Sequence, residues 1–234
     1  MGKVCVVTGA SQGIGRAAAV RMSREPGVDA LILIARSSRG LEETATELSN
    51  GSLRTELIPY DLTDLDGIPA LVKRIHEKYG SIDILLNIAG YADPQSLLDT
   101  STENIVQTYT INVFAMLILI RETARYMIDR PAKILNVAST AGITSRPGWL
   151  AYASSKAAVV SLSATLADEL AGSGIKVYSI SPGRTATELR RKLAPEEDPS
   201  TIMQPGQVAD VIAQLMSDTE VTLDGQNIIV RTRA

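Results

Sequence analysis

The fold is decided by the stretch Val4-Cys5-Val6-Val7-Thr8-Gly9-Ala10-Ser11-Gln12-Gly13-Ile14-Gly15. Its first four residues are apolar and mostly β-branched, as expected of a strand buried on both faces of a parallel sheet. A glycine-rich turn follows, and residues 16–24 continue with a helical composition. Glycines in such a strand–turn–helix unit let backbone N–H groups approach a phosphate at the helix N-terminus. The stretch therefore predicts a nucleotide-binding unit, with an ordinary βα turn as the alternative.

The same alternation of buried strand and helix continues along the rest of the chain. Further strands are predicted at 31–35, 53–60, 82–86, 134–138, 177–180 and 226–230, and further helices at 41–48, 64–79, 102–128, 151–170 and 207–216. Strands that alternate with helices imply a parallel, doubly wound sheet. We therefore expect an α/β protein, a three-layer Rossmann fold whose seven-stranded parallel sheet has helices on both faces, formed as a single domain over residues 1–234.

The composition excludes several classes of protein. The 234 residues are 45% hydrophobic and 21% charged with a net charge of −3, which is typical of a globular domain and gives no reason to expect nucleic-acid binding. The most apolar run, 113–120, is far shorter than the ~20 residues of a membrane span, and the N-terminal apolar run is too short for a signal peptide. We expect a cytoplasmic protein that binds neither nucleic acid nor membranes.

Cysteine and histidine are almost absent from the chain. The single Cys5 lies in an apolar strand, which excludes an intrachain disulfide framework and fits a reducing compartment. The single His76 lies near the end of an amphipathic helix, where we expect a surface or capping residue without chemistry. With one residue of each type, a dedicated Cys/His metal site is not expected.

A candidate for proton-transfer chemistry lies in the helix predicted at 151–170. Tyr152 and Lys156 are four residues apart, so they project from one face of a helix. A phenol has a pKa of about 10, and a nearby ammonium group favours the phenolate and lowers that pKa. Tyr152 could then exchange a proton with a substrate alcohol or carbonyl. A Tyr-x-x-x-Lys pair on a solvated helix is the alternative, and only the rest of the chain can decide between them.

The end of the second strand bears on which dinucleotide would bind. The stretch Ala35-Arg36-Ser37-Ser38-Arg39 has no acidic residue. An Asp or Glu at this place binds the adenosine ribose hydroxyls, whereas a basic residue accommodates a 2′-phosphate. The stretch therefore favours NADP(H), with Arg36 as the main phosphate partner and Ser37 or Arg39 assisting. A solvated loop arginine is the alternative.

Two further stretches carry polar or small residues at informative places. Asn87-Ile88-Ala89-Gly90 follows the fourth strand, at the carboxyl edge where open α/β sheets bind ligands. Asn112 lies in the middle of a predicted helix beside a strongly apolar run. Asparagine is a poor helix former, so Asn112 is either a hydrogen-bonded structural group or part of a site.

In this order and spacing, the stretches resemble the classical short-chain dehydrogenase/reductase family over the whole chain. Residues 8–15 are similar to its TGxxxGxG turn, residues 87–90 to its NNAG motif and residues 182–187 to its PGxVxT motif. The resemblance implies four catalytic residues, namely Asn112, Ser139, Tyr152 and Lys156. It implies cofactor contacts, including the adenine-binding acid after the third strand, from Gly9, Ser11, Gln12, Gly13, Ile14, Gly15, Arg36, Ser37, Asp61, Leu62, Asn87, Ala89, Gly90, Tyr152, Lys156, Pro182, Gly183, Thr185 and Thr187.

Three positions depart from the pattern of the family. Ile88 replaces the second asparagine of NNAG, which removes a polar group that supports the central strand. Gln12 stands where many NADP-preferring relatives carry Arg or Lys, so the preference for NADP(H) depends on Arg36. Thr185 replaces the usual apolar residue of PGxVxT.

The activity implied by the resemblance is reduction of a small-molecule ketone or aldehyde to an alcohol by hydride transfer from NADPH. Ser139 would bond the carbonyl oxygen, Tyr152 would supply the proton, Lys156 would bond the nicotinamide ribose, and Asn112 would hold a water for reprotonation. The alternatives are an alcohol or sugar dehydrogenase working oxidatively, a catalytically silent dinucleotide-binding regulator, or an inactive structural partner. The resemblance also implies a homodimer or homotetramer that pairs through the helices carrying Asn112 and Tyr152.

The substrate itself is not predicted. Residues 145–150 and the region about 188–206 should form the walls and lid of the substrate pocket, with Trp149 and Leu150 supplying apolar surface. The segment 194–199 is rich in Pro and acidic residues and is expected to be mobile. Four arginines could bind an anionic substrate group or be solvated: Arg146, Arg184, Arg190 and Arg191.

Overall fold

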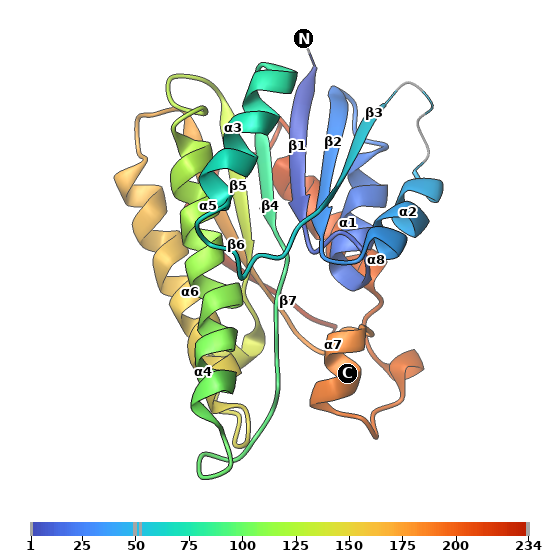
Figure 1. Cartoon of the computed structure of the whole chain (residues 1–234), viewed down its shortest axis with the longest axis vertical. Helices are drawn as coiled ribbons and strands as arrows, with labels where there is room; N and C mark the ends of the chain where they lie inside the picture. The colour runs from blue at the N-terminus through green and yellow to red at the C-terminus, as the bar shows by residue number, and fades with distance from the viewer. Residues whose placement is uncertain (1, 49–50, 52, 233–234) are drawn as a thin grey trace.

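The computed structural model describes residues 2–48, 51 and 53–232, and in that part of the chain seven strands form one parallel sheet (Figure 1). The spatial order is β3-β2-β1-β4-β5-β6-β7. The strands are β1 (Lys3–Thr8), β2 (Val28–Ala35), β3 (Arg54–Pro59), β4 (Ile84–Asn87), β5 (Ala132–Val137), β6 (Ile175–Pro182) and β7 (Asn227–Val230). Every pairing is parallel, so the predicted doubly wound sheet is confirmed.

Helices cover both faces of the sheet. The longer ones are α1 (Gly13–Met22), α2 (Ser38–Thr46), α3 (Ile68–Tyr79), α4 (Thr102–Tyr109), α5 (Ala115–Ala124), α6 (Leu150–Glu169) and α8 (Pro205–Met216). Apolar side chains of α3, α5 and α6 form a core against one face, and those of α1, α2 and α8 form a second core against the other. Burial of both faces explains why the strands are continuous apolar runs.

The order of the strands places the site. The chain runs from β1 outward to β3, then returns to β4 on the other side of β1 and proceeds to β7. The connection that leaves β1 and the connection that leaves β4 therefore run in opposite directions, on opposite faces of the sheet. A crevice forms at such a switch point beside the carboxyl ends of the strands. The glycine turn follows β1 and residues 88–90 follow β4, so both lie at this point.

The helix predicted at 102–128 forms as one run, Thr102–Ala124, but it is irregular and ends early. A π turn, η1 (Thr110–Phe114), separates α4 from α5, and α5 ends at Ala124. Asn112 lies in this turn and bonds two other segments, which accounts for the local widening of the helix. The helix predicted to begin at 64 begins at Ile68, after Gly67.

The region after β6 contains structure where a loop was expected. A short helix, α7 (Glu188–Leu193), is capped by the Thr187 hydroxyl, which accepts from Arg190 N. A turn of 3-10 helix, η3 (Pro199–Thr201), follows it. These elements lie beside the carboxyl end of the sheet, below β7 in Figure 1.

One helical run, Thr102–Ala124, is long and apolar enough to cross a membrane by length and composition. Half of its most apolar window is buried inside the protein, and α5 packs against α3. Core helices of globular proteins share these properties, so the run is explained by its packing.

Asp83 joins three strands at the amino edge of the sheet. Its carboxylate accepts from Val4 N, Ser81 Oγ and Arg130 Nη2, each at 2.8 Å.

We expect Asp83→Ala to lower the free energy of unfolding by about 2–4 kcal/mol, because Val4 N–H would be left buried and unpaired. Denaturant unfolding measures this. Asp66→Ala, at an exposed position, is the control and should change stability by less than ~0.5 kcal/mol; an equal effect of both substitutions would contradict the role of Asp83.

Candidate active site

The glycine turn lies directly against the end of β4. Gly9 has φ +68°, and a Cβ there would lie 2.8 Å from Ala89 Cα. A Cβ on Gly15 would lie 2.1 Å from Gly9 O, and Gly13 has φ +56°. Only glycine satisfies these distances and angles without displacing the backbone. The turn thus packs tightly against the end of β4 on one side and leaves its main chain open to a ligand on the other.

Side chains around the turn hold it in place. The Thr8 hydroxyl accepts from Ile88 N at 3.0 Å and Ala89 N at 3.1 Å, which ties the end of β1 to the segment after β4. Thr44 Oγ1 donates to Ala10 O at 2.8 Å, and Arg16 Nη2 donates to Ser11 O at 2.7 Å. Since position 88 contributes its backbone N–H, Ile88 preserves this junction.

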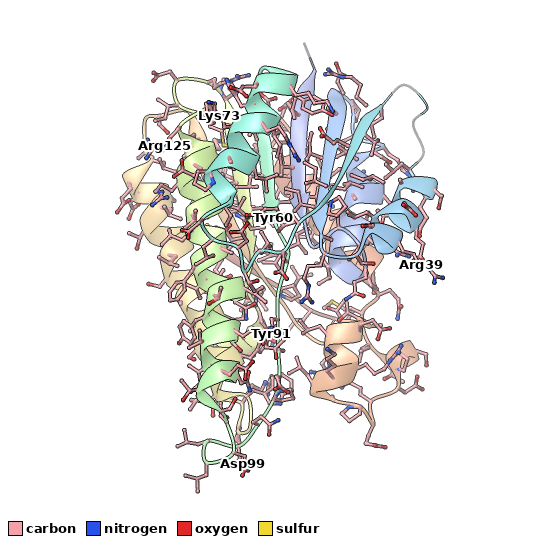
Figure 2. All side chains as sticks on the ribbon, viewed as in Figure 1. Arg39, Tyr60, Lys73, Tyr91, Asp99 and Arg125 are labelled. Atoms are coloured by element: carbon pink, nitrogen blue, oxygen red, sulfur yellow. The ribbon has the colours of Figure 1, made fainter. Side chains whose placement is uncertain are left out.

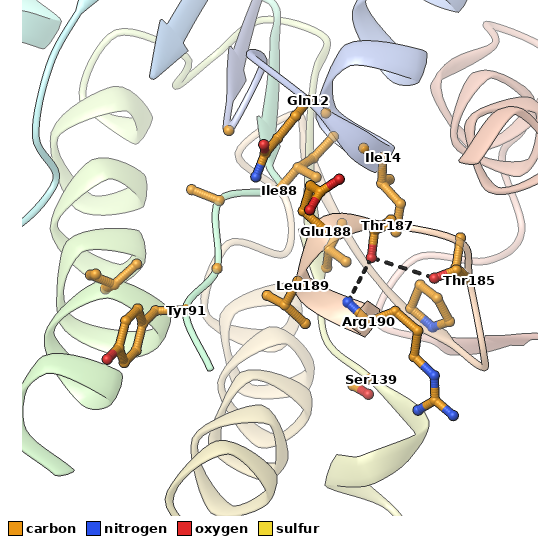
Figure 3. Close-up of a pocket in the computed structure, with 18 of the residues that line it drawn as sticks. Gln12, Ile14, Ile88, Tyr91, Ser139, Thr185, Thr187, Glu188, Leu189 and Arg190 are labelled. Carbon is orange, nitrogen blue, oxygen red and sulfur yellow. Dashed lines mark hydrogen bonds between the residues drawn. The ribbon is translucent and has the colours of Figure 1, made fainter. Parts of the chain in front are cut away.

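A cleft of about 810 Å³ opens at the carboxyl ends of the strands (Figure 3). Of the predicted catalytic residues, Ser139, Tyr152 and Lys156 line it. Of the predicted cofactor residues, those that line it are Gly9, Ser11, Gln12, Gly13, Ile14, Gly15, Arg36, Ser37, Asp61, Leu62, Ala89, Gly90, Tyr152, Lys156, Pro182, Gly183, Thr185 and Thr187. The cleft therefore brings together segments from the whole length of the chain.

Two predicted site residues lie behind the cleft wall. Asn87 is buried, and its Nδ2 donates to Asn136 Oδ1 at 2.9 Å. Asn112 is also buried; its Oδ1 accepts from Tyr91 N, while its Nδ2 donates to Tyr91 O and Ser155 Oγ. Its side chain thus holds the segment after β4 against α6. Neither Asn87 nor Asn112 lines the large cleft. The cofactor contact predicted for Asn87 and the water contact predicted for Asn112 therefore lie outside the cleft lining.

Ser139 has the geometry of a hydrogen-bond donor to a ligand. It follows β5 and caps the 3-10 turn η2 (Thr140–Gly142), with its Oγ accepting from Ala141 N at 3.1 Å. The N–H group of Ala141 occupies one lone pair of the Ser139 oxygen, so the hydroxyl proton of Ser139 stays available. That proton can be donated into the cleft.

Tyr152 and Lys156 are both buried on α6. Lys156 Nζ donates to Val137 O at 2.8 Å and lies 6.0 Å from the centre of the Tyr152 ring. Burial lowers the pKa of Lys156 to about 8. Burial raises the pKa of the Tyr152 phenol, and interactions with Ser139 and the Arg190 charge oppose that rise. The predicted lowering of the Tyr152 pKa by Lys156 stays a prediction, since the Lys156 ammonium group lies close to the ring while it bonds the strand carbonyl.

The opposite end of the cleft carries the residues expected at the adenosine. Arg36 is exposed and lines the cleft, while the Asp61 carboxylate accepts from Thr63 N and Thr63 Oγ1. Hydrogen bonds from Thr63, with a smaller contribution from the Arg36 charge, lower the pKa of Asp61. Ser37 caps α2, accepting from Gly40 N. Arg39 is 89% exposed, pairs with Glu43 on the outer side of α2 (Figure 2) and does not line the cleft.

The walls expected around the substrate are present in part. Trp149 lines the cleft together with Tyr91, Leu189 and Leu193, whereas Leu150 is half-exposed and lies outside it. Tyr91, on the segment beside α4 in Figure 2, was not predicted.

The four candidate arginines have different surroundings. Arg184 and Arg190 line the cleft and pair with Glu197, whereas Arg191, which does not line the cleft, pairs with Glu188 at its rim. Arg146 lines the cleft and makes no ion pair within the described part of the chain. Mobility of the segment 194–199 stays a prediction; here Glu197 anchors that segment.

Gly142 is a positioning residue that the sequence analysis missed. A Cβ on Gly142 would lie 2.6 Å from Lys156 C and 2.7 Å from Ala157 N. The loop carrying Ser139 can therefore contact the backbone of α6 only because this residue is glycine. The signal available in the sequence was a glycine three residues after Ser139.

The residues present fit a bound dinucleotide. The glycine turn lies at the N-terminus of α1, where exposed N–H groups favour a phosphate, and the cleft continues from there to Ser139 and Tyr152. Within residues 2–48, 51 and 53–232, His, Cys, Asp and Glu form no group of three or more that could hold a metal ion. The chemistry of the donors thus suits NAD(P).

Comparison with known proteins gives the same assignment. A family model described as short chain dehydrogenase matches residues 3–198. The chain is 34% identical over 239 residues to the 3-oxoacyl-(acyl-carrier-protein) reductase FabG of Thermotoga maritima, which covers 97% of this chain and 95% of that protein.

Solved structures agree in fold and differ in cofactor. A 3-ketoacyl-(acyl-carrier-protein) reductase from Brucella melitensis complexed with NADH is 27% identical, with a TM-score of 0.88 over 98% of this chain and 96% of that one. A protein assigned as an NAD(P)-dependent gluconate 5-dehydrogenase from Beutenbergia cavernae, with NADP at low occupancy, is 28% identical, with a TM-score of 0.89 over 97% and 94%. The chain belongs to the short-chain dehydrogenase/reductase family, as an NAD(P)-binding oxidoreductase that acts on CH–OH or C=O groups.

Proposed function

We propose that the protein reduces a ketone or aldehyde of a small molecule to an alcohol, using NADPH. The observation that carries the proposal is that Ser139, Tyr152 and Lys156 line the same cleft as the glycine turn. A reactive carbonyl can therefore be held between the hydroxyl groups and a nicotinamide. In this proposal residues 1–234 act as a single domain, with the region about 188–206 as its substrate loop.

Each side chain has a defined task. The bound cofactor supplies the hydride. Ser139 donates a hydrogen bond to the carbonyl oxygen as negative charge develops there, and Tyr152 donates the proton that completes the alcohol. Lys156 has further N–H donors besides the one bound to Val137 O, and these are available to a cofactor ribose.

Reprotonation of Tyr152 requires a path for protons. A cavity of about 10 Å³ borders Asn87, Asn112 and Lys156, and has room for about one water. Asn87 Oδ1 is buried without a hydrogen-bond partner in the described part of the chain. These features support a water beside Lys156, held by the walls that Asn112 fixes rather than by direct bonds from its side chain.

The environment of Tyr152 suits the proposed role of its phenol as a proton donor. Burial raises the pKa of the phenol, so the group stays protonated near neutral pH and is ready to act as an acid. Alcohol oxidation, the alternative, needs the phenolate as a base. A silent dinucleotide-binding regulator would not need these three side chains in one cleft.

The choice of NADP(H) rests on Arg36. It is the basic residue at the end of β2 that lines the cleft, and the stretch 35–39 has no carboxylate to meet ribose hydroxyls. Structural neighbours contain either NADH or NADP, so this chain's own residues support the preference.

Homo-oligomerisation is part of the proposal. The run α4–η1–α5 exposes apolar side chains that a second copy could cover: Ile105, Val106, Phe114 and Leu117. They support a homodimer or homotetramer formed through this run and α6.

The role of Tyr152 is tested by Tyr152→Phe. Because the phenylalanine has no proton to donate, kcat for carbonyl reduction should fall by about 10²–10⁴-fold. NADPH binding, measured by fluorescence titration, should change less than ~3-fold. Tyr109→Phe removes a hydroxyl that bonds Ser154 outside the cleft, and should keep kcat. Substantial turnover by Tyr152→Phe would contradict the proposed role of Tyr152 as the proton donor.

The burial of Lys156 predicts a pH-dependent stability difference. The folded pKa of about 8 lies below the unfolded value of about 10.4, so the unfolded state binds more protons between these values. The cost of burying the ammonium is present below pH 8 and is relieved as pH rises toward 10.4. Relative to Lys156→Met, cofactor-free wild type should therefore gain up to about 1.4 kcal/mol in unfolding free energy per pH unit in this window. A constant difference from pH 7 to 10 would contradict it.

The cofactor preference is tested by kcat/KM for NADPH and NADH. The parent protein should prefer NADPH, and Arg36→Asp should lower kcat/KM for NADPH by about 10-fold or more while sparing NADH, because a carboxylate repels the 2′-phosphate and binds ribose hydroxyls. Arg39→Asp, outside the cleft, is the matched control. Equal use of both cofactors by the parent would refute the assignment.

A further inference from the structure

Arg190 connects the substrate loop to the catalytic helix. It lies on α7, and its guanidinium centre is 5.6 Å from the centre of the Trp149 ring. The Trp149 ring in turn packs edge-on against the Tyr152 ring, with centroids 6.3 Å apart. All three side chains line the cleft, and Figure 3 shows Arg190 extending from α7 toward the side of the cleft where Ser139 lies.

We propose that Arg190 is a positioning residue of this active site, whose guanidinium, held over Trp149 by Glu197, stabilises the phenolate left on Tyr152 after proton transfer. The inference rests on the proposed function, in which the proton passes from Tyr152 Oη to the substrate oxygen and the electron pair stays on the phenolate. Positive charge near that oxygen lowers the free energy of the product of the transfer.

The ion pairs around Arg190 fix its position without cancelling its charge. Arg190 Nε and Nη2 donate to the two carboxylate oxygens of Glu197, at 2.5 and 3.0 Å. Arg184 Nη1 also donates to Glu197, at 3.2 Å. Two guanidinium groups share one carboxylate, so the cluster keeps a net positive charge. The Arg190 side chain is only 19% exposed, whereas that of Arg184 is 62% exposed, so Arg190 is the less screened charge.

The other charged groups around the cleft occupy different places from Arg190. On α6, Lys156 lies 6.0 Å from the centre of the Tyr152 ring and is bonded to the Val137 carbonyl, so Arg190 adds a second cation from α7. At the rim, Arg146 and Arg184 are exposed, and Glu188 has the opposite sign. Stabilisation of the phenolate requires that Arg190 lower the pKa of Tyr152. The Arg190 charge does so, opposing the rise in that pKa which burial causes.

The test is the ionisation of Tyr152 itself, followed by NMR of tyrosine labelled with ¹³C at the ζ carbon and assigned with Tyr152→Phe. Arg190→Met should raise the Tyr152 midpoint by about 0.5–1 pH unit, because a nearby cation is lost. Arg190→Lys, which keeps the charge, should restore most of the wild-type midpoint. Arg191→Met is the matched control: it is the next residue on α7, 69% exposed and outside the cleft lining, and should leave the midpoint unchanged.

Kinetics supply the second readout. In alcohol oxidation, which requires the phenolate, the acid limb of the kcat profile should move to higher pH by the same amount in Arg190→Met, lowering kcat at pH 7 by roughly 3- to 10-fold. An unchanged midpoint in Arg190→Met, or an equal shift in Arg191→Met, would overturn the inference. Shifted midpoints without carbonyl turnover in any variant would instead refute the proposed function and leave the electrostatic role of Arg190 supported.

Discussion

The backbone of Gly9 passes so close to Ala89 that no side chain fits between them, and the site depends on this contact. An added Cβ would lie 2.8 Å from Ala89 Cα. Because β1 and β4 are neighbours at the switch point of the sheet, the contact brings the glycine turn to the segment after β4. The Thr8 hydroxyl, bonded to two backbone N–H groups of that segment, then holds the junction whatever side chain stands at position 88. The asparagine that the family resemblance suggests there is therefore dispensable for this contact.

Features set by local spacing could be predicted from the sequence. The apolar strand runs and the glycine turn specify the parallel sheet, because both faces of such a sheet are buried. Tyr152 and Lys156 share a helix face by their four-residue separation, and Ser139 follows a strand that ends at the same edge. The family resemblance added that these three side chains belong together, and the cleft does contain all three.

Features set by contacts between distant segments could not be predicted. Asn112 was placed in a regular helix, but bonds to Tyr91 and Ser155 accompany a π turn there. The need for glycine at 142 arises from the backbone of α6, which no local pattern encodes. The candidate arginines look alike in sequence; only the fold shows that Arg190 faces the cleft and Arg191 does not. The direction of the Lys156 ammonium likewise depends on a strand carbonyl nineteen residues earlier.

Burial of Tyr152 both suits and hinders proton transfer. A buried phenol stays protonated near neutral pH, which suits a proton donor, but the phenolate that remains is poorly solvated. Lys156 is bonded to Val137 O on the strand side, and Arg190 of α7 brings a further cation to the Trp149 side of the cleft. If that charge stabilises the phenolate, it does so only while α7 lies against Trp149. If the segment around α7 also encloses the substrate, as we propose, the Arg190–Glu197 ion pair would couple enclosure to proton transfer.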